Sequence, residues 1–455
     1  MINLFEYQNK AELPCELEGL EDFLDEVWKK RDKSDFYLNG DSDRVEVQQF
    51  IQFLHRTREI KSNKYVGVIH FGGRRVNLLP KIFYRPGVEP SEGEVQGMQQ
   101  HILWWLSYCR KIKFPSYQTA LGSLKSDFFE VLIYLFSKYT RELLSSSIYQ
   151  QYEEVSRELP YIKGRLDTNA YVNENISRGR WHRLSCTYDA FVVDNRFNRI
   201  IKYVTSLLFT VTTSSENKKY LREILFILDE VSEVRATAEE CACLKFNPMF
   251  SEFETVRDYC YLFLSSSVSF SYKNDLKLFA FLLPMEYVFE DFVFGFIEKE
   301  VKEVQAKAQV TSQYLDHGQA FALRPDLLLQ IGDRSVIADT KYKIVYSDEK
   351  DPKKGVLQAD LYQMLAYAVR FNVDEVILFY PKTIEGYQEK VAELLIVDEL
   401  AGGRRIKVKA FQLPIITENL SFHEDRKDVA LSLLFDAVKD DLISSIRKSL
   451  IICDR

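Results

Sequence analysis

The sequence predicts an α+β protein of several domains, with a small β-rich module first, a mainly helical middle region and a C-terminal α/β domain. Three observations support this prediction. Apolar runs flank Gly-Gly and Gly-Asp pairs, as in β-hairpins, and long stretches between them have helical spacing. The last third alternates helices with short apolar strands, the pattern of a mixed sheet flanked by helices. The expected domains are 1–90, 91–280 and 281–455.

The composition is that of an ordinary globular protein, with 455 residues, 46% hydrophobic and 28% charged. The net charge of −7 gives no global sign of nucleic-acid binding, so such a partner requires a local basic surface or another subunit. We expect no secretory signal and no membrane span, because no long apolar run is present. Seven scattered cysteines favour reduced thiols and a cytoplasmic location.

The N-terminal module combines helical spacing at Val45–His55 with a hairpin over Lys64–Phe83, whose turn is Gly72-Gly73. Arg74 and Arg75 follow this turn directly. Either they face solvent, or they form a tip that contacts a partner.

The middle region begins after a polar linker at 84–96, and helical spacing runs over 97–152, 195–211, 216–235 and 250–266. Between 157 and 202, nine basic and five acidic residues give a local charge of +4. Arg178 and Arg180 stand there beside Trp181, a combination that can contact phosphates and stack on bases. The alternative is a solvated face with internal ion pairs.

The C-terminal domain contains the stretch with the strongest candidates for catalytic residues, 321–343. Apolar strands flank Gly332-Asp333 as in a hairpin, and the second strand ends in Asp339-Thr340-Lys341. Other expected elements are helices at Met285–Lys302, Leu357–Arg370 and about 426–449, a buried strand at Val376–Tyr380, and a hairpin formed by Lys390–Val397 and Arg405–Leu413.

Two carboxylates and a lysine can converge on this hairpin. Asp339 and Lys341 are two residues apart and share one face of the strand, and Asp326 stands near the start of the partner strand. Mg²⁺ prefers oxygen ligands and keeps several waters, so Asp326 and Asp339 suffice, with the Thr340 carbonyl as a third ligand. Lys341 would orient or deprotonate a metal-bound water. The alternative is a hairpin with an ordinary surface ion pair.

Two neighbouring helices add polar groups to this candidate site. Glu290, on the helix before the hairpin, can supply another oxygen. Gln363 and Tyr367, four apart on the helix after it, share one face and can hydrogen-bond a phosphate or the metal shell.

These residues carry a family resemblance. Arg324-Pro325-Asp326, then Asp339-Thr340-Lys341, then Gln363-x-x-x-Tyr367 resemble the PD-(D/E)xK nuclease superfamily and its RecB-like members. Over roughly 60–380 the chain is similar to the McrC family, the nuclease subunits of McrBC-type modification-dependent restriction systems. The stretches that carry the narrower resemblance are Val66–Ile82, Lys163-Gly164-Arg165 and Asp194-Asn195-Arg196-Phe197-Asn198-Arg199.

The resemblance implies a C-terminal nuclease core that cuts modified DNA with Mg²⁺, or with Mn²⁺ in its place. It assigns Asp326 and Asp339 as metal ligands and Lys341 as the catalytic lysine. Its match to Glu290 as a further site residue is weaker. It also implies docking on a hexameric AAA+ GTPase like McrB, whose hydrolysis the chain stimulates. The sequence has no G-x-x-x-x-G-K-[ST] and therefore no nucleotide site of its own.

Two alternatives remain open from the sequence. One is a RecB-like DNA exonuclease that acts alone. Its iron–sulfur form needs three cysteines downstream of the core, where only Cys453 is present. The other is a non-catalytic adaptor that activates an AAA+ partner. Intact Asp326, Asp339 and Lys341 favour an active nuclease.

Overall fold

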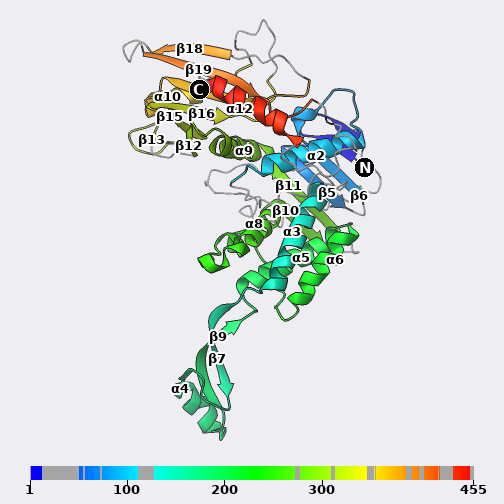
Figure 1. Ribbon diagram of the computed structural model, residues 1–455, viewed down its shortest axis with the longest axis vertical. Helices are drawn as coiled ribbons and strands as arrows, with labels where there is room; N and C mark the ends of the chain where they lie inside the picture. The colour runs from blue at the N-terminus through cyan, green and yellow to red at the C-terminus, as the bar shows by residue number, and fades with distance from the viewer. Residues whose placement is uncertain are drawn as a thin grey trace. The chain divides into compact units, whose positions relative to one another are not determined.

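The computed structural model of the chain is shown in Figure 1. It describes residues 2–12, 51–54, 57–71, 74–110, 128–271, 277–308, 313–345, 353, 355–385, 392–398, 404–418, 420 and 434–450. The chain forms two compact units, one of residues 1–131 and 265–455, the other of residues 132–264. This grouping differs from the expected division at 90 and 280, which stays a prediction.

The first unit contains a five-stranded sheet in which the order is β1-β6-β5-β11-β10. The neighbours β1 and β6 are parallel, and the other pairs are antiparallel. A small antiparallel sheet, β2-β4-β3, accompanies it. The strands are β1 (Ile2–Phe5), β2 (Lys10–Glu12), β3 (Ile51–Leu54), β4 (Glu59–Ser62), β5 (Tyr65–Phe71), β6 (Arg74–Leu79), β10 (Ser267–Ser271) and β11 (Lys277–Pro284), and a 3-10 turn, η2 (Lys81–Phe83), follows β6.

The predicted hairpin at 64–83 is confirmed, since β5 and β6 pair with Phe71 opposite Arg74. Its Gly72-Gly73 turn lies outside the described residues. The predicted helix at Val45–His55 is wrong at 51–54, where β3 pairs with β4, and 45–50 and 55 lie outside the described residues. Buried Ile51 and exposed Gln52 alternate as in a strand, so pairing across the sheet overrides the local helical spacing.

A six-stranded mixed sheet forms the other half of this unit, in the order β12-β15-β16-β17-β19-β18. The central strands β16, β17 and β19 are parallel, whereas β15 and β18 pair antiparallel with their neighbours. The strands are β12 (Gln305–Ala308), β15 (Leu327–Ile331), β16 (Arg334–Thr340), β17 (Glu375–Pro381), β18 (Ala392–Asp398) and β19 (Arg404–Leu413), with a separate pair β13 (Gln313–Tyr314) and β14 (Ala322–Leu323).

Both faces of the central strands are buried, as expected for a sheet covered by helices. Ile337, Val376 and Val408 pack against α10 (Gln358–Phe371) in one hydrophobic cluster. Their neighbours in the strands, such as Val336 and Ile377, are equally buried on the opposite face. The predicted mixed α/β architecture of this region is therefore confirmed.

Three further helices belong to the first unit: α2 (Glu92–Leu106), α9 (Met285–Glu300) and α12 (Asp436–Leu450). A capping box between Ser91 and Glu94 starts α2. The Trp104 ring of α2 meets Phe292 of α9 edge-on at 5.2 Å and stacks on Phe435, next to α12, at 4.8 Å. Aromatic packing therefore joins these helices.

The second unit is built from helices and a β-arm. The helices are α3 (Phe128–Ser146), which enters from the first unit, α5 (Arg196–Val211), α6 (Ser215–Ile227), α7 (Ala238–Ala242), a 3-10 turn η6 (Pro248–Phe250) and α8 (Glu252–Ser266). Edge-on aromatic contacts hold them together, for example Phe136 of α3 against Tyr259 and Phe263 of α8.

The arm consists of two long antiparallel strands, β7 (Gln151–Leu159) and β9 (Leu184–Val192). The segment between them has no regular pattern in the sequence. It forms β8 (Arg165–Leu166), α4 (Thr168–Ala170), a π-turn η4 (Tyr171–Asn175) and a 3-10 turn η5 (Ile176–Arg178). The predicted helical middle region thus also contains strands, whose described residues are mostly half-buried or exposed.

The arm is fixed at its base by two asparagines that precede and open α5. Asn195 and Asn198 both donate through Nδ2 to the Tyr149 carbonyl before β7 and to the Val193 carbonyl after β9, at 2.7–3.1 Å. Asn195 Oδ1 also caps α5. The Asp194–Arg199 motif therefore holds the two ends of the arm together through hydrogen bonds.

No helix among the described residues is long and apolar enough to cross a bilayer.

Candidate active site

The hairpin β15–β16 sets Asp326 opposite Asp339. Its two-residue turn uses Gly332 at φ +56°, a left-handed conformation that glycine adopts without steric cost. Leu327 pairs with Ala338, so the next pair outward in this register is Asp326 and Asp339. Facing residues of an antiparallel pair point to the same side, so the two carboxyl groups are neighbours.

Asp326 is held in place by the backbone and side chain of Thr340. Both the Thr340 N–H and its hydroxyl donate to Asp326 Oδ2 at 2.8 Å. On the other side, the Tyr367 hydroxyl donates to the Arg324 carbonyl at 3.0 Å and accepts a hydrogen bond from Gln363 at 2.8 Å. Gln363 and Tyr367 of α10 thus support the turn that presents Asp326. The predicted contacts of Tyr367 and Gln363 with DNA or a metal shell stay predictions, as does the Thr340 carbonyl ligand.

Lys341 follows β16 and shares the face of Asp339. Its ammonium forms an ion pair with the Asp339 carboxylate. Its N–H donates to the Phe379 carbonyl of β17 at 2.8 Å, which continues the parallel ladder. Burial alone would lower the pKa of Lys341, but the carboxylates of Asp339, Asp326 and Asp360 hold it above its usual value. The side chain is therefore a cation and a hydrogen-bond donor at neutral pH.

The negative charges of Asp326 and Asp339 are not fully balanced by hydrogen bonds and positive charge, so the pKa values of both groups are raised. Burial, followed by the charges of Asp339 and Glu290, raises the pKa of Asp326 to about 7, despite the hydrogen bonds from Thr340. Burial also raises the pKa of Asp339, against the opposing effect of Lys341. Glu290 of α9 is close enough to raise both values, so the structure brings this predicted residue to the site.

The donor set fits a small divalent cation that brings its own waters. Among the residues that the structure describes, Asp339 Oδ1 has no hydrogen-bond partner although Asp339 is fully buried. In the same part of the chain, no three His, Cys, Asp or Glu side chains form a preformed metal cluster. Mg²⁺ needs few protein ligands and retains water, so two facing carboxylates suit it.

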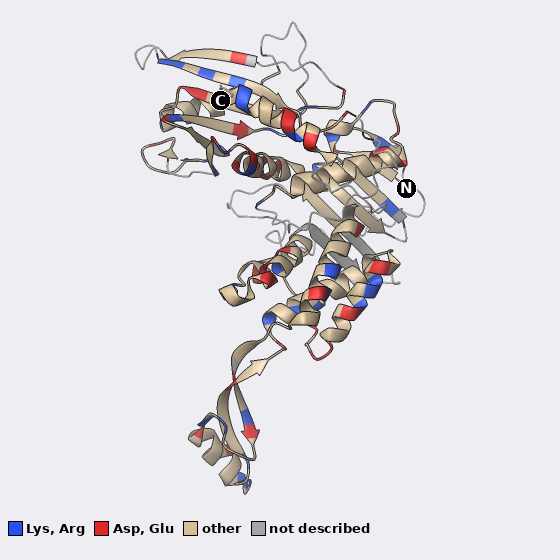
Figure 2. Cartoon of the chain, viewed as in Figure 1, with Lys and Arg blue, Asp and Glu red and all other residues tan. Residues whose placement is uncertain are grey.

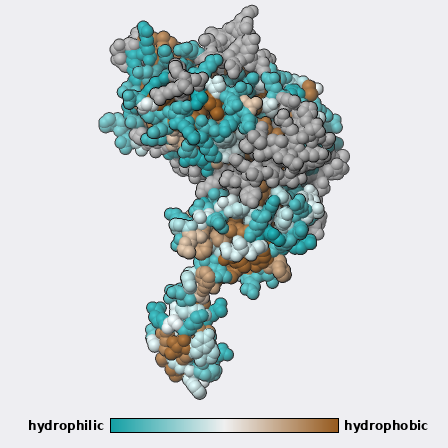
Figure 3. Space-filling model, in the orientation of Figure 1, coloured by the Kyte–Doolittle hydropathy of each residue, from teal (hydrophilic) through white to brown (hydrophobic). Residues whose placement is uncertain are grey.

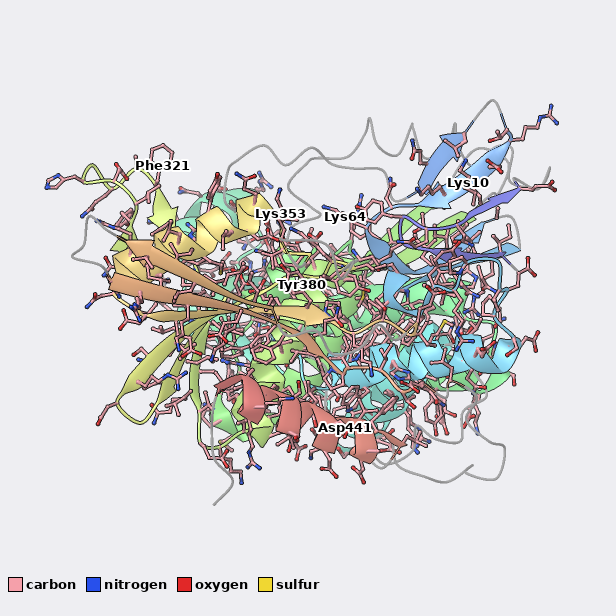
Figure 4. The ribbon with its side chains drawn as sticks, turned by 90° about the horizontal axis from the view of Figure 1, so that it is seen from above. Lys10, Lys64, Phe321, Lys353, Tyr380 and Asp441 are labelled. Carbon is pink, nitrogen blue, oxygen red and sulfur yellow. The ribbon has the colours of Figure 1, made fainter. Side chains whose placement is uncertain are left out.

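Sequence reasoning missed Asp360 and Lys343. Asp360 lies in the first turn of α10, is 5% exposed, and accepts hydrogen bonds from Lys343 Nζ at 2.9 and 3.0 Å. Burial and the Asp360 and Asp339 carboxylates raise the pKa of Tyr380, which Figure 4 labels on β17. The only signal in the sequence was an acid three residues before Gln363, which is common at a helix start.

The remaining predicted contact residues lie elsewhere. Arg75 Nε donates to Asn77 Oδ1 at 2.9 Å within β6, and the Arg74 side chain lies outside the described residues. Arg178 is exposed and Arg180 half-buried near the tip of the arm, where the Arg180 guanidinium donates to the Glu174 carbonyl. Arg165 and Arg183 of the arm form ion pairs with Glu154 and Glu158, so the basic residues of this segment are partly neutralised (Figure 2).

The arm also exposes large apolar side chains, and Figure 3 shows apolar residues gathered on it. Trp181 is 72% exposed, and the Tyr171 hydroxyl donates to its carbonyl at 2.6 Å. Exposed apolar groups rimmed by charge are typical of an interaction surface. The others are Tyr152, Tyr161, Ile162, Val172, Ile176 and Phe191.

The chain is similar to chains of two solved structures from Thermococcus gammatolerans. One is a chain of the refined half-complex from a tetradecameric assembly of McrB AAA+ hexamers with bound McrC. It is 17% identical, with a TM-score of 0.65 over 98% of this chain and 99% of that chain. A chain of the cryo-EM structure of the McrBC complex is 20% identical, with a TM-score of 0.46 over 66% of this chain and 88% of that one. The first likeness shows that the fold is shared over nearly the whole length. A search of curated proteins finds no significant match.

A family model described as a McrBC 5-methylcytosine restriction system component matches residues 60–381. This range covers well over half of the chain and coincides with the stretch in which the sequence motifs show the resemblance. The chain therefore belongs to the family of McrBC 5-methylcytosine restriction system components.

Proposed function

We propose that this chain is the DNA-cleaving subunit of a McrBC-like restriction complex and hydrolyses phosphodiester bonds in modified DNA with Mg²⁺. The observation that carries the proposal is the pair of facing carboxyl groups, half-buried Asp326 and fully buried Asp339, with the Lys341 ammonium on the same face. In the terms of the superfamily, β15, β16 and the helices around them form the PD-(D/E)xK core.

Each residue of the site has a distinct role in this proposal. Asp326 and Asp339 hold the metal, and Glu290 adds negative charge that strengthens cation binding. When bound, Mg²⁺ polarises the scissile phosphate and lowers the pKa of a coordinated water. Gln363 and Tyr367 keep Asp326 in position through the Arg324 carbonyl.

Lys341 acts as a cation rather than as a general base. Its raised pKa keeps it protonated at neutral pH, where it can donate hydrogen bonds. A protonated lysine beside the phosphate orients the attacking water and stabilises the charge that develops on the phosphoryl oxygens. Deprotonation of the water therefore falls to another group or to bulk solvent.

The proposed partner is a hexameric AAA+ GTPase like McrB, whose hydrolysis this chain stimulates. The family membership supports this, as does the lack of a phosphate-binding loop in the sequence. The arm is the surface that we assign to the partner or to DNA, because it combines exposed aromatic side chains with Arg178 and Arg180. We propose the cytoplasm as the setting for this activity.

The experiment is a cleavage assay with the AAA+ partner and GTP, on methylated and unmethylated closed-circular DNA. We expect cleavage of methylated circles in Mg²⁺ or Mn²⁺ and none in EDTA. A stand-alone exonuclease would leave circles intact and degrade linear DNA without the partner. The variant Asp339→Asn should be inactive, whereas Asp333→Asn, at the exposed turn of the same hairpin, should cut normally. Failure of the wild-type protein to cut any methylated DNA would overturn the proposal.

A further inference from the structure

The residue after Lys341 is tied to the opposite end of the chain. Tyr342 is buried, and its hydroxyl donates to Glu6 Oε2 at 3.0 Å. Its ring lies 4.5 Å from Lys81 Nζ and 5.8 Å from the ring of Phe289 in α9. A buried polar contact thus joins the end of β16 to the end of β1.

Lys341 and Tyr342 follow one another directly after β16, and their side chains contact different elements. Lys341 faces Asp339 and lies near Asp360 of α10, whereas Tyr342 packs against Phe289 of α9. The two side chains are coupled, because one peptide unit joins them and the Lys343 N–H donates to the Lys341 carbonyl at 2.8 Å, which closes a tight turn around Tyr342. An anchor on Tyr342 therefore fixes the direction of the Lys341 side chain.

Glu6 is itself rigidly placed. It is 1% exposed, its N–H donates to the Leu79 carbonyl at 3.0 Å, and its Oε2 also accepts the Lys81 N–H at 3.2 Å. The next residue, Tyr7, has φ +59°, a conformation that costs free energy for a side chain of this size and persists only where surrounding contacts enforce it. The turn after β1 is thus held so that Glu6 points inward.

The surroundings keep the Glu6 carboxyl largely neutral. Burial raises the pKa of Glu6 to about 8, although Lys81 acts in the opposite direction. A neutral carboxyl group and a carboxamide accept the same hydrogen bonds, so glutamine is a close replacement. A backbone hydrogen bond also joins the N-terminal and C-terminal parts of this unit, because the Ile384 N–H donates to the Ile82 carbonyl at 2.9 Å.

We propose that Glu6 is a positioning residue for the cutting centre: the hydrogen bond from Tyr342 to Glu6 lets the N-terminal sheet set the direction of Lys341. This inference rests on the proposed nuclease function. It assigns to the first strand of the chain a part in DNA cleavage, in addition to any part in partner docking.

The test is a double-mutant cycle of DNA cleavage with the AAA+ partner present. Tyr342→Phe removes only the hydroxyl and should lower the maximal cleavage rate by roughly tenfold to a hundredfold, without raising the DNA concentration for half-maximal rate. Glu6→Ala should have a similar effect, and the double variant should be no worse than either single one. Glu6→Gln should retain close to wild-type cleavage.

A matched control separates positioning from general stability. Tyr108→Phe also deletes a tyrosine–glutamate hydrogen bond within the first unit, from Tyr108 to Glu300 at 2.9 Å, at the end of α9. It leaves the backbone contact of Tyr108 with Gly295 in place and changes no group that contacts Asp339 or Lys341. Tyr108→Phe should cleave DNA at the wild-type rate, and its thermal stability should equal that of Tyr342→Phe. Equal cleavage by Tyr342→Phe and wild type, additive effects in the cycle, or equal losses in the two Tyr→Phe variants would overturn this inference alone. An inactive wild-type protein would overturn the proposed function, and this inference with it.

Discussion

At the residue scale, Asp326 shows that the site is not arranged for maximal stability. Its carboxyl group is half-buried beside Asp339 and Glu290, whose charges oppose its ionisation, whereas the hydrogen bonds from Thr340 favour the ionised form. Like charges in a buried site oppose one another until a cation neutralises them. Removal of one of these charges should therefore stabilise the metal-free protein against unfolding, as expected for a binding site.

We predict that Asp326→Asn stabilises the metal-free protein at pH 8 but not at pH 4. The folded pKa of about 7 exceeds the usual value, so the stability that Asp326 contributes is present below about pH 4 and is lost as the pH rises through 7. At pH 8 the variant should unfold roughly 2–4 °C higher in EDTA by calorimetry. Asp333→Asn should show no shift. A lower unfolding temperature for Asp326→Asn at pH 8 would contradict the electrostatic argument.

The same group predicts a pH dependence of cleavage. A protonated Asp326 cannot hold a cation, so at limiting Mg²⁺ the cleavage rate should rise by up to about tenfold per unit below pH 7 and level off above it. More Mg²⁺ should move the midpoint to lower pH, because the metal competes with the proton. Initial rates between pH 5.5 and 8.5 measure this, and a flat profile would speak against Asp326 as a ligand.

The acids of the hairpin could be predicted from the sequence because strand alternation and a short turn fix their neighbours. Asp360 and Glu6 could not. Asp360 meets Lys343 across 17 residues and Glu6 meets Tyr342 across 336, and no local periodicity reports such pairs. A buried acid is recognised only when its surroundings are known.

At the element scale, α9 carries a close approach that depends on glycine. A Cβ at Gly295 would lie 1.9 Å from the Tyr108 carbonyl oxygen, which is backbone and cannot move aside freely. This contact sets how near α9 lies to the end of α2, and with it the position of Glu290.

We predict that Gly295→Ala destabilises the protein by about 1–3 kcal/mol through overpacking, despite the better helix propensity of alanine. Gly93→Ala, in α2 with open space around it, is the matched control and should be neutral or slightly stabilising. Chemical denaturation of both variants measures the difference. Equal stabilities would show that the two helices can separate without cost.

The starts of two helices could be predicted closely: the helical spacing from 195 and from Met285 agrees with α5 (Arg196–Val211), which Asn195 caps, and with α9 (Met285–Glu300). The strand β3 was missed because its apolar residues also fit a helical period, and only pairing with β4 decides between them. The structure of the arm was not predicted, since its described strand residues are mostly half-buried or exposed and Cys186 alone among them is buried, so no buried face gives a period-two pattern.

At the scale of the whole molecule, the chain forms one unit with the candidate cutting site and another with the arm. The sequence indicated the β-rich start, the helices and the final α/β region. It did not indicate that β10 and β11, from 267–284, complete the N-terminal sheet beside β5. Such long-range pairing joins the two ends of the chain into one unit.

For the arm, we predict that the double charge reversal Arg178→Glu and Arg180→Glu lowers stimulation of partner hydrolysis, or DNA affinity, by about tenfold at low salt and less at high salt. The control is Lys218→Glu with Lys219→Glu on α6, an equal change of charge at exposed positions in the same unit. Hydrolysis rates and DNA binding at two salt concentrations measure the effect. Equal hydrolysis rates and equal DNA binding in the two double variants would contradict a role of Arg178 and Arg180 in partner or DNA contact.

The central claim is that Asp339 belongs to a metal-dependent cutting centre and not to a purely structural hairpin. It is tested most directly by measuring DNA cleavage and partner GTP hydrolysis in the same reaction for wild type and Asp339→Asn. We expect the variant to lose cleavage while it stimulates hydrolysis as strongly as wild type. Retained cleavage by Asp339→Asn would contradict it.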